Sequence, residues 1–118
     1  MKIIGIDPGL IQTGFGIINV SNNQTTLIDY GIIKPQAKDT LANRLLTIFN
    51  DVCEIISNYN PQIFAIEEVF YGKNVKSAMR LGQARGASMV AAASKNIPIY
   101  EYSPRKVKQS ITGNGNAH

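Results

Sequence analysis

Two acidic residues of this chain follow short apolar runs, at positions where carboxylates can bind a metal ion. Asp7 comes at the end of the apolar run at residues 3–6, and Glu67 follows the run at residues 63–66. If the runs form neighbouring parallel strands, both carboxylates converge at one edge of the sheet, where open α/β sheets keep their sites. Carboxylates held close together repel each other, and a shared cation removes the repulsion. The pair therefore predicts a divalent-metal site.

Each carboxylate also has a simpler explanation. Asp7 precedes Pro8 and Gly9, a combination that forms turns for purely local reasons. Glu67 can equally be a solvated loop residue. The apolar run before Asp7 does not alternate with polar residues, which is typical of a strand buried on both faces. The matched placement of the two residues, each at a strand end, favours the metal site.

The composition indicates one small domain with a basic second part. The chain has 118 residues, of which 44% are hydrophobic, and a net charge of +4. Residues 1–72 carry a charge of −3 and residues 73–118 carry +7, an asymmetry that favours a polyanion such as nucleic acid over a merely solvated surface. The single cysteine, Cys53, predicts packing in a reducing cytoplasm. Neither a signal peptide nor a membrane span is expected.

The hydrophobic pattern predicts three strands in a meander, followed by alternating helices and strands. Strands are expected at residues 2–7, 13–20, 25–33, 63–66 and 97–102, and helices from Asp39 or Thr40 to 59, from Asn74 to about 96, and from Ser103 onward. This order predicts a ribonuclease H-like α/β fold, a mixed five-stranded sheet with helices on both faces. Gly14 and Gly16 in the second strand indicate either close approach of a phosphate or backbone, or a twisted edge.

The predicted helix after Asn74 carries small residues on one face. Ala78, Gly82 and Gly86 lie four residues apart, and each glycine costs a helix about 1 kcal/mol relative to alanine. That cost indicates close approach of another backbone. The stripe can form a dimer interface or pack tightly on the sheet of its own chain, and the sequence leaves both open.

An aromatic and basic loop precedes this helix. Phe70 and Tyr71 lie next to Lys73, so these rings can stack on bases or wedge between them. Aromatic residues in such a position also plug the edge of a core, and this alternative remains open.

Several of these stretches resemble the RuvC family of bacterial Holliday junction resolvases. They occur in the family's order: Gly5-Ile6-Asp7-Pro8-Gly9, Ala65-Ile66-Glu67-Glu68-Val69-Phe70, Leu81-Gly82-Gln83-Ala84-Arg85-Gly86, and Tyr102-Ser103-Pro104-Arg105-Lys106. The stretch from Leu81 to Gly86 is the most specific of them. The Ile-Asp-Pro-Gly motif is weak when taken alone.

The resemblance implies a homodimeric, metal-dependent endonuclease that cuts four-way DNA junctions in recombination and repair and leaves 5′-phosphate and 3′-hydroxyl ends. It implies two Mg²⁺ ions per complete site, replaceable by Mn²⁺, with Asp7 bridging both and Glu67 binding one. It also implies a dimer at the Ala78, Gly82 and Gly86 stripe and the RuvA–RuvB branch-migration complex as a partner. The candidate contacts to DNA are Phe70, Tyr71, Lys73, Arg80, Arg85, Lys106 and Lys108.

The family's site has two further acidic residues, in a C-terminal helical segment. We expect residues 1–118 to form a single nuclease domain that lacks this segment, and we therefore expect the 118-residue chain by itself to be inactive on junctions.

Three other functions remain as alternatives. Sugar kinases and actin-like ATPases also place Asp and a glycine turn between two strands, but they need a second lobe. A related nuclease acting on structured RNA and a non-catalytic DNA-binding module are the other two. Comparison of RNA cleavage with junction cleavage separates the nucleases.

The basic second part predicts weak and strongly salt-dependent binding to DNA. Lysine and arginine contacts to phosphates release counterions, so affinity falls as salt concentration rises. We expect the dissociation constant for a four-way junction, measured by fluorescence anisotropy, to increase steeply between low and physiological salt. An affinity that stays constant over this range would argue against an electrostatic surface at residues 73–108.

Overall fold

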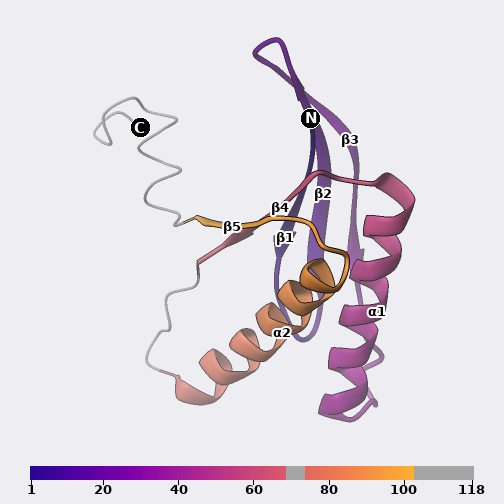
Figure 1. Cartoon of the computed structure of the whole chain (residues 1–118). Coiled ribbons are helices and arrows are strands. Elements are labelled where there is room, and N and C mark those ends of the chain that lie inside the picture. The colour runs from indigo at the N-terminus through magenta and orange to yellow at the C-terminus, as the bar shows by residue number, and fades with distance from the viewer. Residues whose placement is uncertain (69–73, 103–118) are drawn as a thin grey trace.

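The computed structural model describes residues 1–68 and 74–102, which form an α/β fold (Figure 1). Its elements in chain order are β1 (Lys2–Asp7), β2 (Thr13–Ser21), β3 (Gln24–Ile33), α1 (Leu41–Tyr59), β4 (Ile63–Glu67), α2 (Val75–Ser94) and β5 (Ile99–Tyr102). The predicted order of elements is confirmed as far as β5. The short helix predicted from Ser103 lies outside the described residues.

The described strands form one mixed sheet in the order β3-β2-β1-β4-β5. The pairs β1–β2 and β2–β3 are antiparallel, whereas β1–β4 and β4–β5 are parallel. The predicted meander followed by parallel strands is therefore confirmed. Strand β1 lies in the middle of the sheet, as its apolar run predicts.

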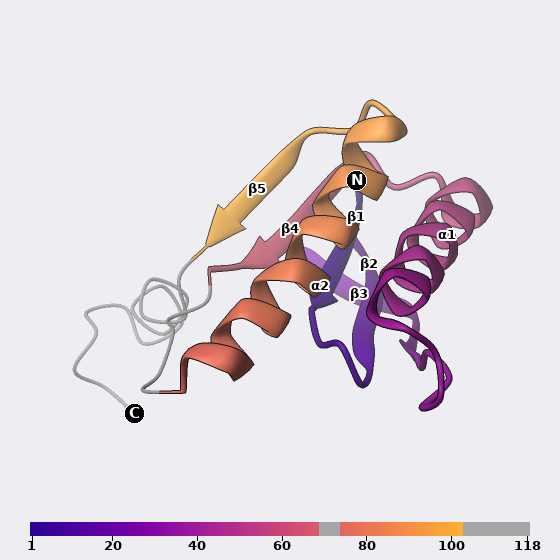
Figure 2. The ribbon, with the colours of Figure 1, turned by 90° about the horizontal axis from the view of Figure 1, so that it is seen from below.

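Helices α1 and α2 cover the same face of the sheet. Every second residue of β1 and β4 is buried there and shares one core with both helices, as Ile4, Phe64, Val52 and Ala91 illustrate. The chain passes from β3 to β4 and from β4 to β5 in the same direction across the sheet, between strands that run parallel. Because such crossovers are right-handed, both helices reach the same face, and they lie beside each other in Figures 1 and 2.

This arrangement corrects the expectation that β1 is buried on both faces. Ile4 and Ile6 are buried, but Ile3 and Gly5 are only half-buried and Asp7 is exposed. The sequence predicts helices on both faces of the sheet. Within residues 1–68 and 74–102, the two helices instead lie on the same face. Neither of these two helices is both long enough and apolar enough to cross a membrane.

Side-chain caps define where both helices begin. The Thr40 hydroxyl accepts a hydrogen bond from the Asn43 amide at 3.2 Å, so Thr40, and not Asp39, is the cap. The Asn74 side chain accepts from the Ser77 amide at 3.1 Å in the same way. Such caps satisfy amides that have no partner within the helix.

Strand β5 begins two residues later than predicted, because Ile97 still bonds to the end of α2 and Pro98 cannot donate a hydrogen bond to the sheet. The Ile97 amide donates to the carbonyl of Ala92 at 3.4 Å, and Asn96 has a left-handed φ of 60°. Pro98 has no amide hydrogen and contributes only its carbonyl, which accepts from Phe64 at 2.9 Å. Strand β4 is one residue longer than predicted and includes Glu67.

The turn after Asp7 is held by a buried threonine. The Thr13 hydroxyl donates to the carbonyl of Gly9 at 2.7 Å and accepts from the Gly9 amide at 3.2 Å. A Cβ atom at Gly9 would lie 2.3 Å from the carbonyl oxygen of Gln12, so the turn requires glycine there. These contacts connect the end of β1 to the start of β2.

Thr13→Val is expected to destabilise the protein by about 1–3 kcal/mol. Valine keeps the shape of threonine but leaves the part-buried amide and carbonyl of Gly9 without their hydroxyl partner. Thermal unfolding followed by circular dichroism measures the change. Thr26→Val, at an exposed position of β3, is the matched control and should change the free energy of unfolding by less than about 0.5 kcal/mol. Equal unfolding midpoints for the two variants would contradict the role of Thr13.

Candidate functional site

The structure brings the two predicted carboxylates together. Strands β1 and β4 are parallel neighbours paired in register up to Ile6 and Ile66, so Asp7 and Glu67 follow at the same level. Both side chains line one hollow of about 290 Å³ on the face of the sheet opposite α1 and α2. Ile6 and Ile66, the residues before Asp7 and Glu67, are buried in the helix-covered core. Because successive strand residues point to opposite faces, Asp7 and Glu67 point to the other face.

Glycines keep the sheet surface beside the carboxylates open. Gly14 pairs with Asp7, and Gly16 pairs with Gly5. A Cβ atom built at Gly5 or Gly16 would have no neighbour within 4 Å. Strand β2 lies between β3 and β1, so the alternative in which Gly14 and Gly16 mark a twisted edge is wrong. The space above them belongs to the hollow.

Tyr102 is a member of the site that the sequence did not indicate. It pairs with Glu67 across β4 and β5 and lines the same hollow. Burial raises the pKa of its hydroxyl above the usual range, and the negative charges of Glu67 and Asp7 raise it further. The hydroxyl is therefore protonated at neutral pH and can donate a hydrogen bond into the hollow. Only the register between β4 and β5 reveals this placement.

The oxygen donors of the hollow fit a hard divalent cation. Mg²⁺ is commonly bound by one or two carboxylates and keeps several waters or phosphate oxygens as its other ligands, and Asp7 and Glu67 supply two such groups. In residues 1–68 and 74–102 there is no cluster of three or more potential metal-binding side chains. Glu68 is exposed, and its amide donates to the carbonyl of Tyr102 at 2.6 Å.

Arg85 lies beneath Glu67 on the helix-covered side of the sheet. Its side chain is only 17% exposed and forms an ion pair with Glu101. Its Nε atom donates to the backbone carbonyl of Glu67 at 3.4 Å. The resemblance implies a contact between Arg85 and DNA, but in this structure the guanidinium binds groups of its own chain.

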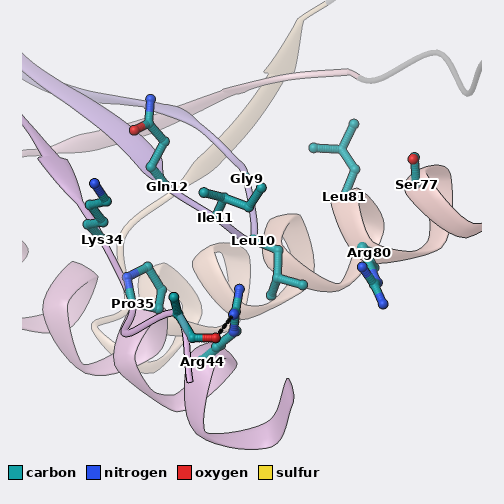
Figure 3. A pocket seen from close by; sticks show the side chains of 11 residues that line it. Gly9, Leu10, Ile11, Gln12, Lys34, Pro35, Arg44, Ser77, Arg80 and Leu81 are labelled. Atoms are coloured by element: carbon teal, nitrogen blue, oxygen red, sulfur yellow. Dashed lines mark hydrogen bonds between the residues drawn. The ribbon is translucent and has the colours of Figure 1, made fainter. Parts of the chain in front are cut away.

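Arg80 lies in a cationic groove on the helix side (Figure 3). The groove has a volume of about 750 Å³, and its charged lining residues are Lys34, Arg44 and Arg80 among mostly apolar neighbours. Asp39 lines a smaller adjoining hollow together with Arg44 and Arg80. Arg44 also binds its own loop, because its Nε atom donates to the carbonyl of Asp39 at 3.3 Å. The sequence did not indicate Lys34 and Arg44, because they belong to the net acidic part of the chain.

The small-residue stripe of α2 faces away from the sheet. Ala78, Gly82 and Gly86 are half-buried, and a Cβ atom at Gly86 would have no neighbour within 4 Å. Met79 and Val90 are 61% and 58% exposed. The residues of α2 that face the core are Ala84, Ser88, Ala91 and Ala92. The remaining predicted DNA contacts, Phe70, Tyr71, Lys73, Lys106 and Lys108, lie outside the described residues.

Comparison with known proteins gives one consistent family. The family described as crossover junction endodeoxyribonuclease RuvC matches residues 3–118. RuvC of Saccharophagus degradans is 48% identical over 115 residues, which cover 98% of this chain and 66% of the relative. RuvC of Caldicellulosiruptor saccharolyticus is 46% identical over 118 residues, which cover 99% of this chain and 71% of the relative. The chain thus spans about two thirds of the length of these relatives.

Solved structures agree in sequence and fold. RuvC of Thermus thermophilus is 31% identical, with a TM-score of 0.88 over 100% of this chain and 73% of the other. The same protein in complex with a Holliday junction substrate gives a TM-score of 0.90 over 100% of this chain and 72% of the other. The family match and the central five-stranded sheet confirm the predicted ribonuclease H-like fold. The chain belongs to the RuvC family of crossover junction endodeoxyribonucleases.

Proposed function

We propose that this chain forms the nuclease core of a metal-dependent endonuclease that resolves four-way DNA junctions. The observation that carries the proposal is the convergence of Asp7 and Glu67 in one open hollow at the ends of adjacent parallel strands. The relatives are named crossover junction endodeoxyribonucleases. The Thermus protein was solved with a Holliday junction substrate, which supports junction DNA as the substrate class.

Asp7 and Glu67 are the residues that would hold the metal, for which the family resemblance implies two Mg²⁺ ions. When bound, Mg²⁺ lowers the pKa of a coordinated water and stabilises charge on the phosphate. The chain itself contributes the placement of both carboxylates by strand pairing and the protonated hydroxyl of Tyr102 beside them. The glycines of β1 and β2 leave room for the substrate backbone.

Contacts to DNA phosphates would come from basic side chains on more than one element. Lys34 and Arg80 approach the same groove from the end of β3 and from α2 (Figure 3). Phosphate contacts of this kind orient the protein on DNA without reading its sequence. The family resemblance extends the proposal to assembly with the RuvA–RuvB complex.

Asp7→Asn is expected to weaken Mn²⁺ binding by at least about tenfold, because it removes a charged ligand. Free Mn²⁺ is measured by electron paramagnetic resonance during a titration. Asp51→Asn, on α1 away from the hollow, is the charge-matched control and should bind as the wild type does. Equal Mn²⁺ affinity in the wild type and in Asp7→Asn would refute the metal site.

The same variants test the substrate. The 118-residue chain by itself is expected to be inactive, so cleavage of a synthetic four-way junction in Mg²⁺ that disappears with Asp7→Asn and persists with Asp51→Asn would contradict that expectation while supporting junction DNA as the substrate. Preferential cleavage of structured RNA would favour a different ribonuclease H-like nuclease.

We also propose that two copies of the chain pair through the small-residue stripe of α2, which faces away from the sheet, since a two-fold interface is self-complementary. Gly86→Leu would place a large side chain where another backbone approaches, and no atom of the same chain lies within 4 Å of the new Cβ. We expect a dimeric wild type and a monomeric variant by light scattering. The free energy of unfolding should fall by no more than the free energy that dimer formation adds.

Ala84→Leu is the matched control for this prediction, because Ala84 is fully buried on the opposite side of α2. It should cost about 1–3 kcal/mol of stability by overpacking the core. A dimer that survives Gly86→Leu would place the interface elsewhere.

A further inference from the structure

Arg85 connects three elements directly behind the proposed metal site. From α2 its Nε atom donates to the carbonyl of Glu67 at the end of β4, and its guanidinium pairs with Glu101 of β5. Its Nη1 atom also lies 3.3 Å from the sulfur of Met89, one turn further along α2. One half-buried side chain thus connects α2 to the ends of the two strands that carry Glu67 and Tyr102.

The contact reaches Glu67 from the side opposite the hollow. Glu101 pairs with Ile66, which is buried in the helix-covered core, whereas Tyr102 pairs with Glu67 and lines the hollow. Successive strand residues point to opposite faces. Arg85 therefore binds the backbone of Glu67 and leaves its carboxylate directed to the other face.

We propose that Arg85 is a positioning residue that fixes the backbone of Glu67 and thereby holds its carboxylate ready for the divalent cation. The inference rests on the metal site proposed above. Glu67 is the last residue of β4, and among residues 1–68 and 74–102 the pairing on its C-terminal side is the Glu68 amide bond to Tyr102. A charged donor at the Glu67 carbonyl restrains this strand end, and partners behind metal ligands of this kind strongly affect metal affinity.

The geometry favours arginine over lysine. The planar guanidinium presents several donors in fixed directions, and Arg85 uses different nitrogens for Glu67, Glu101 and Met89. A lysine ammonium is a single point charge on a flexible stem and would not hold all three groups. Arg85→Lys should therefore behave as an intermediate variant.

The alternative is that Arg85 contacts a DNA phosphate. Its charge is already paired with Glu101, and its side chain is only 17% exposed, so a phosphate contact would require that pair to open. Arg80 lies on the same helix, is exposed, and lines the cationic groove. Arg80 is therefore a matched control, because its exposed guanidinium can meet a phosphate in the way that the alternative requires of Arg85.

The test compares Arg85→Gln, Arg85→Lys, Glu101→Gln and Arg80→Gln in two measurements. Mn²⁺ affinity is measured by electron paramagnetic resonance, and amide hydrogen exchange at Glu68 and Ile4 is measured by nuclear magnetic resonance without metal. We expect Arg85→Gln to weaken Mn²⁺ binding by about tenfold and to speed exchange at Glu68 but not at Ile4. Glu101→Gln keeps the bond to Glu67, so its effects should be smaller.

The control should behave in the opposite way. Arg80→Gln should leave Mn²⁺ affinity and Glu68 exchange unchanged. It should reduce the salt slope of DNA binding, which is the slope of log affinity against log salt concentration, by about one. If Arg85→Gln reduces the salt slope and leaves Mn²⁺ affinity unchanged, Arg85 is a DNA contact and the inference is wrong. It is also wrong if exchange at Ile4 accelerates as much as at Glu68, since that indicates global destabilisation.

The two proposals fail in different ways. Mn²⁺ binding that is absent from the wild type overturns the metal site and the inference together. Mn²⁺ binding that Asp7→Asn abolishes but Arg85→Gln retains in full overturns the inference alone.

Discussion

The parallel pairing of β1 with β4 is the interaction on which the site depends. These strands lie more than fifty residues apart in the sequence, and their register places Asp7 and Glu67 at the same level of the sheet. The backbone ladder and the core beneath it thus hold both carboxylates in one hollow.

The two faces of the sheet serve different purposes. One face carries the buried side chains of β1, β2 and β4 and is covered by both described helices. The other face carries glycines, the two carboxylates and Tyr102 around an open hollow. Alternation along each strand allows this division, because neighbouring residues contribute to the core and to the site in turn.

Much of this organisation could be predicted from local patterns. The strands, both helix caps and the two carboxylates follow from apolar runs, cap residues and turn residues, all of which act over a few positions. Tyr102, Lys34 and Arg44 were missed, because each joins a site only through elements distant in the sequence. Arg85 was predicted as a contact to DNA, and only the packing of α2 on the sheet shows that it also lies against Glu67 and Glu101.

The sequence by itself determined the fold class and the family and predicted the chemical type of the site, since these depend on residue identity and short-range spacing. Only the tertiary structure decided which face of the sheet each residue occupies. Strand register sets the faces of β4 and β5, and the right-handed crossovers place α1 and α2 on the same side. The same geometry turns the stripe of α2 away from the core and directs Arg85 toward the strand that carries Glu67.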